Sequence, residues 1–177
     1  VTNGGGPGVM ATDHAIDLGL DMALLSDTTL EKLNQALPPT WSHGNPVDVI
    51  GDAQAERYQI AVRACLEDSN VDGVLAILTP QAMTKPLESA QTLIALANDH
   101  SKPLLTCWMG EKQVAEARDA FTRAHKPHFR TPEPAVEGEG IEAGRNFREE
   151  ALGHVRLKDV ARADVFDRAR DHRLEPR

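Results

Sequence analysis

The segment from Thr2 to Gly8 carries the residues best suited to chemistry, in the order Thr-Asn-Gly-Gly-Gly-Pro-Gly. It lies between a predicted strand end and a predicted helix start, whose first amides have no partner inside the helix. Glycines let the backbone approach a ligand closely, and aligned peptide dipoles give the helix start about half a positive charge. The pattern predicts a phosphate-binding site formed by Asn3, Gly4, Gly5, Gly6, Gly8 and Val9. A flexible turn that binds nothing is the alternative interpretation of the same residues.

The glycine spacing argues against two common nucleotide sites. No Gly-Lys-Ser or Gly-Lys-Thr follows the turn, as a P-loop would require, and the glycines are not spaced as G-x-G-x-x-G. We therefore predict an oxyanion site at this turn and assign no nucleotide to it.

A second polar loop, from Thr40 to Asp52, contains His43, Asn45 and Asp48. These side chains are candidates for ligand contacts, although Asn and Asp commonly bond to loop backbone and a single loop histidine is commonly solvated. Spacing ties no cysteine, serine or paired carboxylate to His43, so no catalytic residue is expected in this chain. The other histidines lack metal-ligand spacing, and no metal site is expected.

Apolar periodicity places these loops between alternating strands and helices. Helices are expected at 9–19, 27–37, 54–67, 86–100 and 113–125, and strands at 1–3, 20–25, 71–78, 103–109 and 128–130. The first of these strands would be truncated, with its earlier residues missing. The alternation predicts a doubly wound α/β sheet that binds ligands beyond the carboxyl ends of its strands. Thr79 to Thr84 and Cys107 to Glu111 follow the two most apolar strands, as binding loops or as contact surface for another domain.

Composition narrows the classes of partner. The chain is 41% hydrophobic and 26% charged, which is ordinary for a globular protein. Its net charge of -8 argues against nucleic acid and against an anionic membrane surface as partners. The longest apolar run, Val74 to Leu78, is too short to cross a bilayer, so a cytoplasmic location is expected. Cys65 and Cys107 fall within apolar patterns and are expected to be core residues.

Five segments together resemble the NDP-forming acyl-CoA synthetases, relatives of succinyl-CoA synthetase. They are Val1 to Asp13, Asn45 to Ala53, Thr79 to Thr84, Cys107 to Gly110 and Phe129 to Val136. The match looks closest to the bacterial branch joined to a GNAT domain that acetylates protein lysines. The resemblance implies a flavodoxin-like, three-layer α-β-α domain over residues 1–136, similar to the carboxy-terminal domain of the succinyl-CoA synthetase β subunit.

In that family, the resemblance implies that a glycine-turn helix helps to hold a phosphohistidine loop. The role would fall on Asn3, Gly4, Gly5, Gly6 and Gly8. The implied partners are CoA-binding, phosphohistidine and ATP-grasp domains, with a GNAT domain in the branch named above, and an oligomer is expected. The full-length protein would use CoA and ATP or ADP with Mg, none of which this domain would bind alone.

The resemblance implies an acetate–CoA ligase that works through an acyl phosphate and a phosphohistidine. The alternative is a non-catalytic acyl-CoA-sensing or structural module of a bacterial protein lysine acetyltransferase. A third interpretation is an FMN-binding or receiver-type domain that stands alone. Residues 137–177 depart from the family and are dense in Arg, Asp and Glu. This tail is expected to be helical or disordered, and a shifted reading frame or an unrelated origin is our hypothesis for it.

Overall fold

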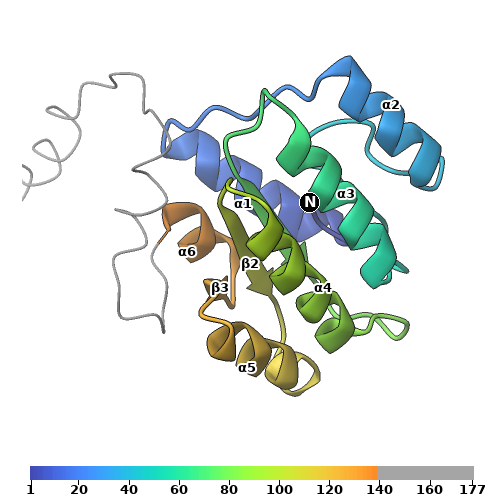
Figure 1. The fold of residues 1–177 in the computed structure, drawn as a ribbon. Helices are drawn as coiled ribbons and strands as arrows, with labels where there is room; N and C mark the ends of the chain where they lie inside the picture. The colour runs from blue at the N-terminus through green and yellow to red at the C-terminus, as the bar shows by residue number, and fades with distance from the viewer. Residues whose placement is uncertain (139–177) are drawn as a thin grey trace, which may run out of the picture.

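This computed structural model describes residues 1–138, in which three helices precede the first strand and strands and helices then alternate (Figure 1). The helices are α1 (Gly5–Asp17), α2 (Asp27–Ala36), α3 (Ala55–Glu67), α4 (Pro86–Asp99), α5 (Ala115–Arg123) and α6 (Pro132–Glu137), with a 3-10 turn η1 (Lys112–Val114) before α5. The strands are β1 (Val74–Leu78), β2 (Leu104–Trp108) and β3 (His128–Phe129). The tail predicted from residue 137 onward lies outside the described residues, except for Glu137 and Gly138.

The strands form a parallel sheet in the order β1-β2-β3, with Val74 opposite Leu104 and Cys107 opposite Phe129. Thr2 extends the sheet beyond β1, because it forms parallel bridges to both Ile77 and Asp48. The segment around Asp48, then Thr2, then β1, β2 and β3 therefore lie side by side. Numbered along the chain, this is the order 2-1-3-4-5 of flavodoxin-like folds. The predicted doubly wound fold is confirmed.

Side chains alternate between the two faces of the sheet, as the pleat requires. On one face, Val74, Ala76 and Leu78 join a core with buried residues of α3, α4 and α5. On the other face, Ile77, Cys107 and Phe129 form a smaller core with Ala135 of α6, against which Ala11 of α1 packs. Figure 1 shows α1 and α6 together, apart from the row of α3, α4 and α5. The sheet thus lies between two helical layers.

The segment between α1 and α2 corrects one prediction. A strand was expected at 20–25, but these residues form no strand. Leu20 is 38% exposed and Leu24 is 85% exposed, so the segment crosses the surface instead of entering the sheet. Two of its backbone carbonyls accept hydrogen bonds from side-chain amides instead of from a neighbouring strand. Asn45 Nδ2 donates to the Ala23 carbonyl, and Asn70 Nδ2 donates to the Leu24 carbonyl. Among residues 1–138, no helix is both long and apolar enough to span a membrane.

Candidate functional site

Thr2 and Asn3 anchor the glycine segment to the centre of the sheet. The Thr2 amide donates to Val47 O at 2.8 Å, and Val49 N donates to Thr2 O at 2.7 Å. The buried Asn3 side chain spans to the next strand, donating to Thr79 O at 2.9 Å and accepting from Thr79 N at 2.8 Å. Both ends of its amide are therefore engaged by backbone, and Asn3 fixes the position of the turn.

The helix after the turn begins earlier than its apolar pattern predicts. It was expected to start at Val9 but starts at Gly5, with Gly4 as the N-cap in an extended conformation. Gly5, Gly6, Pro7 and Gly8 are thus its first four residues. Pro7 is tolerated because the first-turn amides have no partner within a helix, so its missing N–H removes no hydrogen bond. The glycine-rich segment is the first turn of α1 and not a loop ahead of it.

The backbone amides at this helix start differ in whether they already donate a hydrogen bond. The Gly4 amide donates to Thr2 Oγ1 at 3.1 Å, and the Gly8 amide donates to Gly4 O at 3.3 Å. Gly5 and Gly6 are exposed, and no side chain caps the helix. Val9 lies within the helix and its side chain is 54% exposed. The amides of Gly5 and Gly6 are therefore the ones placed to meet an anion, whereas the binding roles expected of the other residues stay predictions.

Packing requires glycine at position 8 and leaves little space at Gly4. A Cβ at Gly8 would lie 2.9 Å from Thr2 Cγ2 and 3.7 Å from the ring of Pro46, so only glycine lets α1 lie this close to the sheet. A Cβ at Gly4 would lie 3.1 Å from Thr79 Oγ1. By contrast, a Cβ at Gly6 would meet no atom within 4 Å. Gly4 and Gly8 are therefore confined by their neighbours, whereas the space beside Gly6 is open.

Of the three candidate residues in the second loop, Asp48 is the one whose side chain lies beside the turn. Its Oδ1 accepts a hydrogen bond from Ile50 N at 2.9 Å, and its Oδ2 lies 3.4 Å from the Cβ position of Gly5. A carboxylate beside a helix N-terminus stabilises the helix dipole. The same carboxylate repels an incoming anion, so Asp48 weakens anion binding at this turn.

The side chains of His43 and Asn45 bond to segments other than the glycine turn. His43 Nδ1 lies 2.9 Å from Asn34 Oδ1 on α2 and its Nε2 lies 3.0 Å from Pro39 O, while the ring lies at a tilt against that of Trp41, with centroids 4.9 Å apart. Asn45 donates to Ala23 O and precedes a cis peptide bond to Pro46. Both residues hold the loop against the α2 side of the molecule. A ligand contact for either stays a prediction.

Thr79 and Tyr58 complete the surroundings of the turn. The Thr79 hydroxyl is buried beneath Gly4 and has no hydrogen-bond partner among the described residues. Tyr58 donates to Ile77 O at 2.7 Å, and burial raises the pKa of its phenol well above the usual value. Tyr58 therefore stays a neutral structural donor. The position of Thr79 directly after β1 is the sequence signal that pointed to this loop.

Comparisons with known proteins agree with this fold. A family described as the Ligase-CoA domain matches residues 1–136. Acetate–CoA ligase (ADP-forming) I of Archaeoglobus fulgidus is 38% identical over 136 residues, which cover 77% of this chain and 19% of that protein. The α subunit of acetate–CoA ligase (ADP-forming) II of Pyrococcus furiosus is 35% identical over 138 residues, covering 75% of this chain and 30% of the subunit.

A solved structure gives the same result in three dimensions. It is a dinucleotide-forming acetyl-coenzyme A synthetase 1 of Ca. Korarchaeum cryptofilum in complex with phosphate and ADP, with a TM-score of 0.74 and 27% sequence identity. The similarity covers 87% of this chain and 32% of that one. The chain thus spans about a fifth to a third of the length of these relatives, which are larger synthetases or their subunits.

Proposed function

This chain belongs to the Ligase-CoA domain family, and from that premise we propose that it serves an NDP-forming acetate–CoA ligase by stabilising a phosphoryl group at the start of α1. A histidine of another domain would carry the phosphoryl group. The observation that supports this role is the uncapped helix start, where Gly5 and Gly6 are exposed and their amides are placed to meet an anion. The acetate–CoA ligases among the relatives support the reaction class.

The physical basis is preorganisation. Two amides and the helix dipole are fixed before the anion arrives, because Asn3 and Thr2 hold the turn against the sheet. A helix start stabilises an exposed anion by about 0.3–1 kcal/mol, and by up to about 2 kcal/mol where the site is partly buried. One such end is weak alone. The proposed role therefore includes a second donor group from the domain that carries the histidine.

The other components of the reaction would bind elsewhere. Among residues 1–138, no group of three or more His, Cys, Asp or Glu side chains is placed to hold a metal ion. The glycine turn also lacks the Lys and Ser or Thr with which a P-loop holds a nucleotide. We assign magnesium, nucleotide and CoA to the partner domains that the family resemblance implies.

The test is Gly6→Val in a full-length protein that contains this chain. Helical Cβ atoms tilt toward the N-terminus, so the new side chain would occupy the space in front of the amides without a clash inside the domain. We expect the rate of histidine phosphorylation from ATP to fall about 100-fold, the scale of losing an oxyanion donor. The unfolding midpoint should stay close to that of the parent.

Gly44→Val is the matched control, because a Cβ at Gly44 also meets nothing within 4 Å and the Gly44 carbonyl accepts a hydrogen bond from Ser42 of its own loop. It should leave phosphorylation unchanged. If Gly6→Val is folded and phosphorylates its histidine at the parental rate, the proposed role of the turn is wrong.

The GNAT-linked branch and the non-catalytic module rest on the sequence resemblance alone. The flanking sequence distinguishes them from a ligase. A histidine in the phosphorylation loop together with an intact ATP-grasp domain would support the ligase. Loss of both, together with a GNAT domain, would support the acetyltransferase module.

A further inference from the structure

The exposed large apolar side chains gather on α1 and on the segment that follows it. Within residues 1–138, seven such side chains are exposed, and six of them lie between Val9 and Leu24. These six are Val9, Met10, Ile16, Leu18, Leu20 and Leu24, and the seventh is Met83. Single exposed apolar residues are ordinary on a protein surface, whereas a cluster of them marks an interaction site.

Helical geometry places the apolar residues of α1 on one stripe. Each residue is turned by about 100° from the one before it, so Val9, Met10 and Ile16 fall within about a third of the circumference. Asp13 and Asp17 lie in the same sector. All five residues are exposed, whereas the buried residues of α1 lie outside this sector and face the sheet. We call these five residues the α1 stripe.

The α1 stripe begins beside the candidate anion site. Gly6 falls in the same sector of the helix, about one turn before Val9 and Met10, and Ile16 lies about 15 Å from Gly6 along the axis. A domain that presents an anion to the first amides of α1 would therefore have the apolar residues of the stripe directly next to it.

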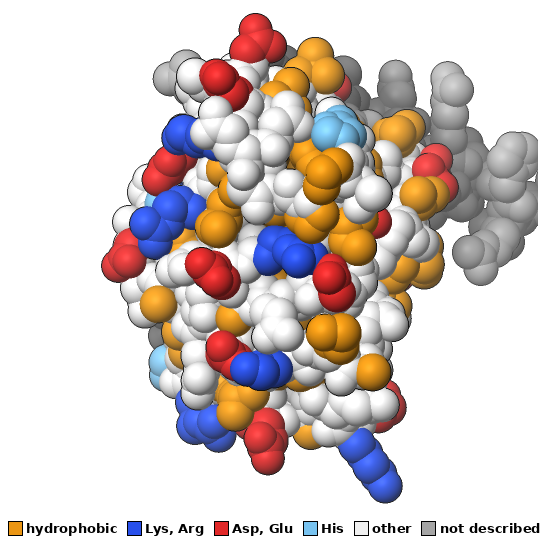
Figure 2. All heavy atoms as spheres, turned by 90° about the vertical axis from the view of Figure 1, so that its right-hand side faces the viewer, with side chains coloured by type: hydrophobic (Ala, Val, Ile, Leu, Met, Phe, Trp, Pro, Cys, Tyr) orange, Lys and Arg blue, Asp and Glu red, His pale blue; other side chains and the backbone are white. Residues whose placement is uncertain are grey.

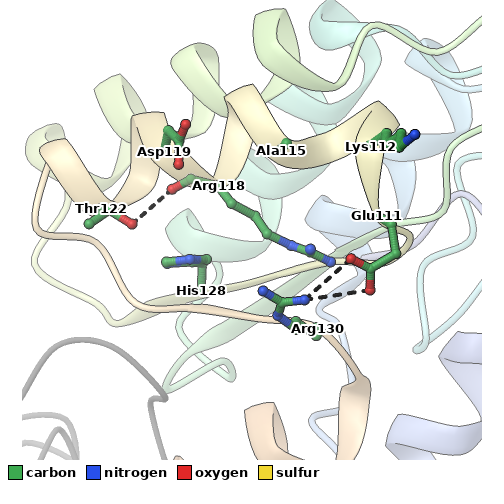
Figure 3. Close-up of a pocket in the computed structure, with 8 residues that line it drawn as sticks. All are labelled: Glu111, Lys112, Ala115, Arg118, Asp119, Thr122, His128 and Arg130. Atoms are coloured by element: carbon green, nitrogen blue, oxygen red, sulfur yellow. Dashed lines mark hydrogen bonds and ion pairs between the residues drawn. The ribbon is translucent and has the colours of Figure 1, made fainter.

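Other parts of the described surface have a different character. The groove between α5 and β3 is lined mainly by charged and polar side chains, among them Glu111, Arg118 and Arg130 (Figure 3). On the face shown in Figure 2, acidic and basic side chains are interspersed without a region of one sign. An exposed apolar stripe on a helix therefore distinguishes α1 within residues 1–138.

The charges on and beside the α1 stripe are negative. Asp13 and Asp17 lie within it, Asp21 follows it, and residues 1–31 contain no Lys or Arg. None of these three carboxylates forms an ion pair with another residue of the described part of the chain. Two copies of the chain would bring their carboxylates together at this face, which opposes self-association. A surface with Lys and Arg around an apolar centre complements it.

We propose that the α1 stripe is the docking surface for the companion domain that carries the phosphorylated histidine, and that this domain meets it with apolar side chains rimmed by Lys and Arg. The proposal rests on the function proposed above for the glycine turn. This chain spans about a fifth to a third of the length of its relatives, so most of each relative lies outside this domain. Docking along α1 would raise the effective concentration of the histidine at the helix start.

Methionine oxidation tests the docking in the full-length protein without any substitution. Met10 is 43% exposed and Met83 is 61% exposed in this chain, so similar rates of oxidation are expected if neither is covered. If a domain covers the stripe, hydrogen peroxide should convert Met10 to its sulfoxide about tenfold more slowly than Met83. Peptide mass spectrometry measures both rates. Oxidation of Met10 as fast as that of Met83 would overturn the proposal.

Two substitutions in the full-length protein should release the docked domain. Ile16→Ser removes an apolar contact and Asp13→Lys reverses a charge, and each should raise Met10 oxidation to the Met83 rate and slow histidine phosphorylation about tenfold. Both positions are exposed, so the unfolding midpoint should stay unchanged. Asp72→Lys reverses an exposed charge ahead of β1, and this matched control should alter neither readout. Parental protection of Met10 in both variants would contradict the proposed surface.

A photoreactive benzophenone side chain at position 10 identifies what covers the stripe. Cross-links to the domain that carries the histidine support the proposal, whereas cross-links to a second copy of residues 1–138 or to residues 139–177 overturn it. Gly6→Val separates the docking surface from the role of the turn, because it should leave Met10 protected. If that variant also phosphorylates its histidine at the parental rate, the docking surface stands and the phosphoryl role falls.

Discussion

Asp68 joins the ends of two helices through a single carboxylate. Its Oδ2 accepts hydrogen bonds from the amide and hydroxyl of Ser26, the N-cap of α2, at 2.8 and 3.0 Å. Its Oδ1 accepts from Asn70 N just beyond the end of α3 at 2.9 Å. Burial raises the pKa of this carboxyl, but the hydrogen bonds from Asn70, Ser26 and Thr29 outweigh burial and hold the pKa at about 2.

This depressed pKa predicts a dependence of stability on pH. Because the folded pKa lies below the unfolded value of 3.8, the contribution is fully present above about pH 4 and is lost as pH falls through 2. Its size is about 2 kcal/mol. Asp68→Asn should lower the free energy of unfolding by about this amount at pH 7, as measured by urea denaturation.

The difference between Asp68→Asn and the parent should shrink as pH approaches 2, because the parental carboxyl then becomes protonated. Asp72→Asn, which changes an exposed carboxyl nearby, serves as the control and should change stability little. A deficit in Asp68→Asn that stays constant between pH 7 and pH 2 would contradict the assigned cause.

At the scale of elements, the surface segment between α1 and α2 gives the sharpest test. Leu24 is 85% exposed, so Leu24→Ser should change the free energy of unfolding by less than about 0.5 kcal/mol. Leu33 of α2 is fully buried, and Leu33→Ala should cost about 2–5 kcal/mol. Thermal and urea denaturation of both variants measure this contrast. A cost for Leu24→Ser comparable to that of Leu33→Ala would show that the segment is packed after all.

Helices with strong apolar periodicity could be predicted from the sequence, whereas the question of which extended segments pair in the sheet could not. Tyr58, Ala61, Val62 and Cys65 fall on one predicted helix face and are all buried in α3. The apolar run at 20–25 looks like a strand, but it has no neighbour in the sheet, and sequence carries no local signal for that.

The candidate site shows the same limit. Local sequence placed the glycine turn ahead of a helix but did not reveal that the helix absorbs it from Gly5 onward. The approach of Asp48 to the turn spans more than 40 residues, so local sequence carried no signal for it.

At the scale of the whole molecule, the two layers are unequal within residues 1–138. Among these residues, the core on the face covered by α3, α4 and α5 has 24 buried members, whereas the core on the face covered by α1 and α6 has four. Apolar burial is the main stabilising term in folding, so the α1 and α6 side is the weaker half. His14 on α1 and Glu137 at the end of α6 add one partly exposed contact of 2.9 Å between these helices.

This asymmetry predicts an order of opening. In native-state hydrogen exchange, amides of α1 and α6 should exchange through openings of lower free energy than amides of α3 and α4. The measurement is exchange at increasing, sub-denaturing concentrations of guanidinium. Equal opening free energies in all four helices would mean that the domain opens as one unit and that the thin layer has no separate weakness.

The close approach of Gly8 to Thr2, with open space above Gly6, has a consequence for natural variation. Position 8 is constrained by the architecture, so it should remain glycine even in descendants that have abandoned catalysis. Position 6 is free of that architectural constraint and would be kept only by selection for the reaction. Drift at position 6 with glycine retained at position 8 would therefore mark a lineage that inherited the scaffold and lost its chemistry.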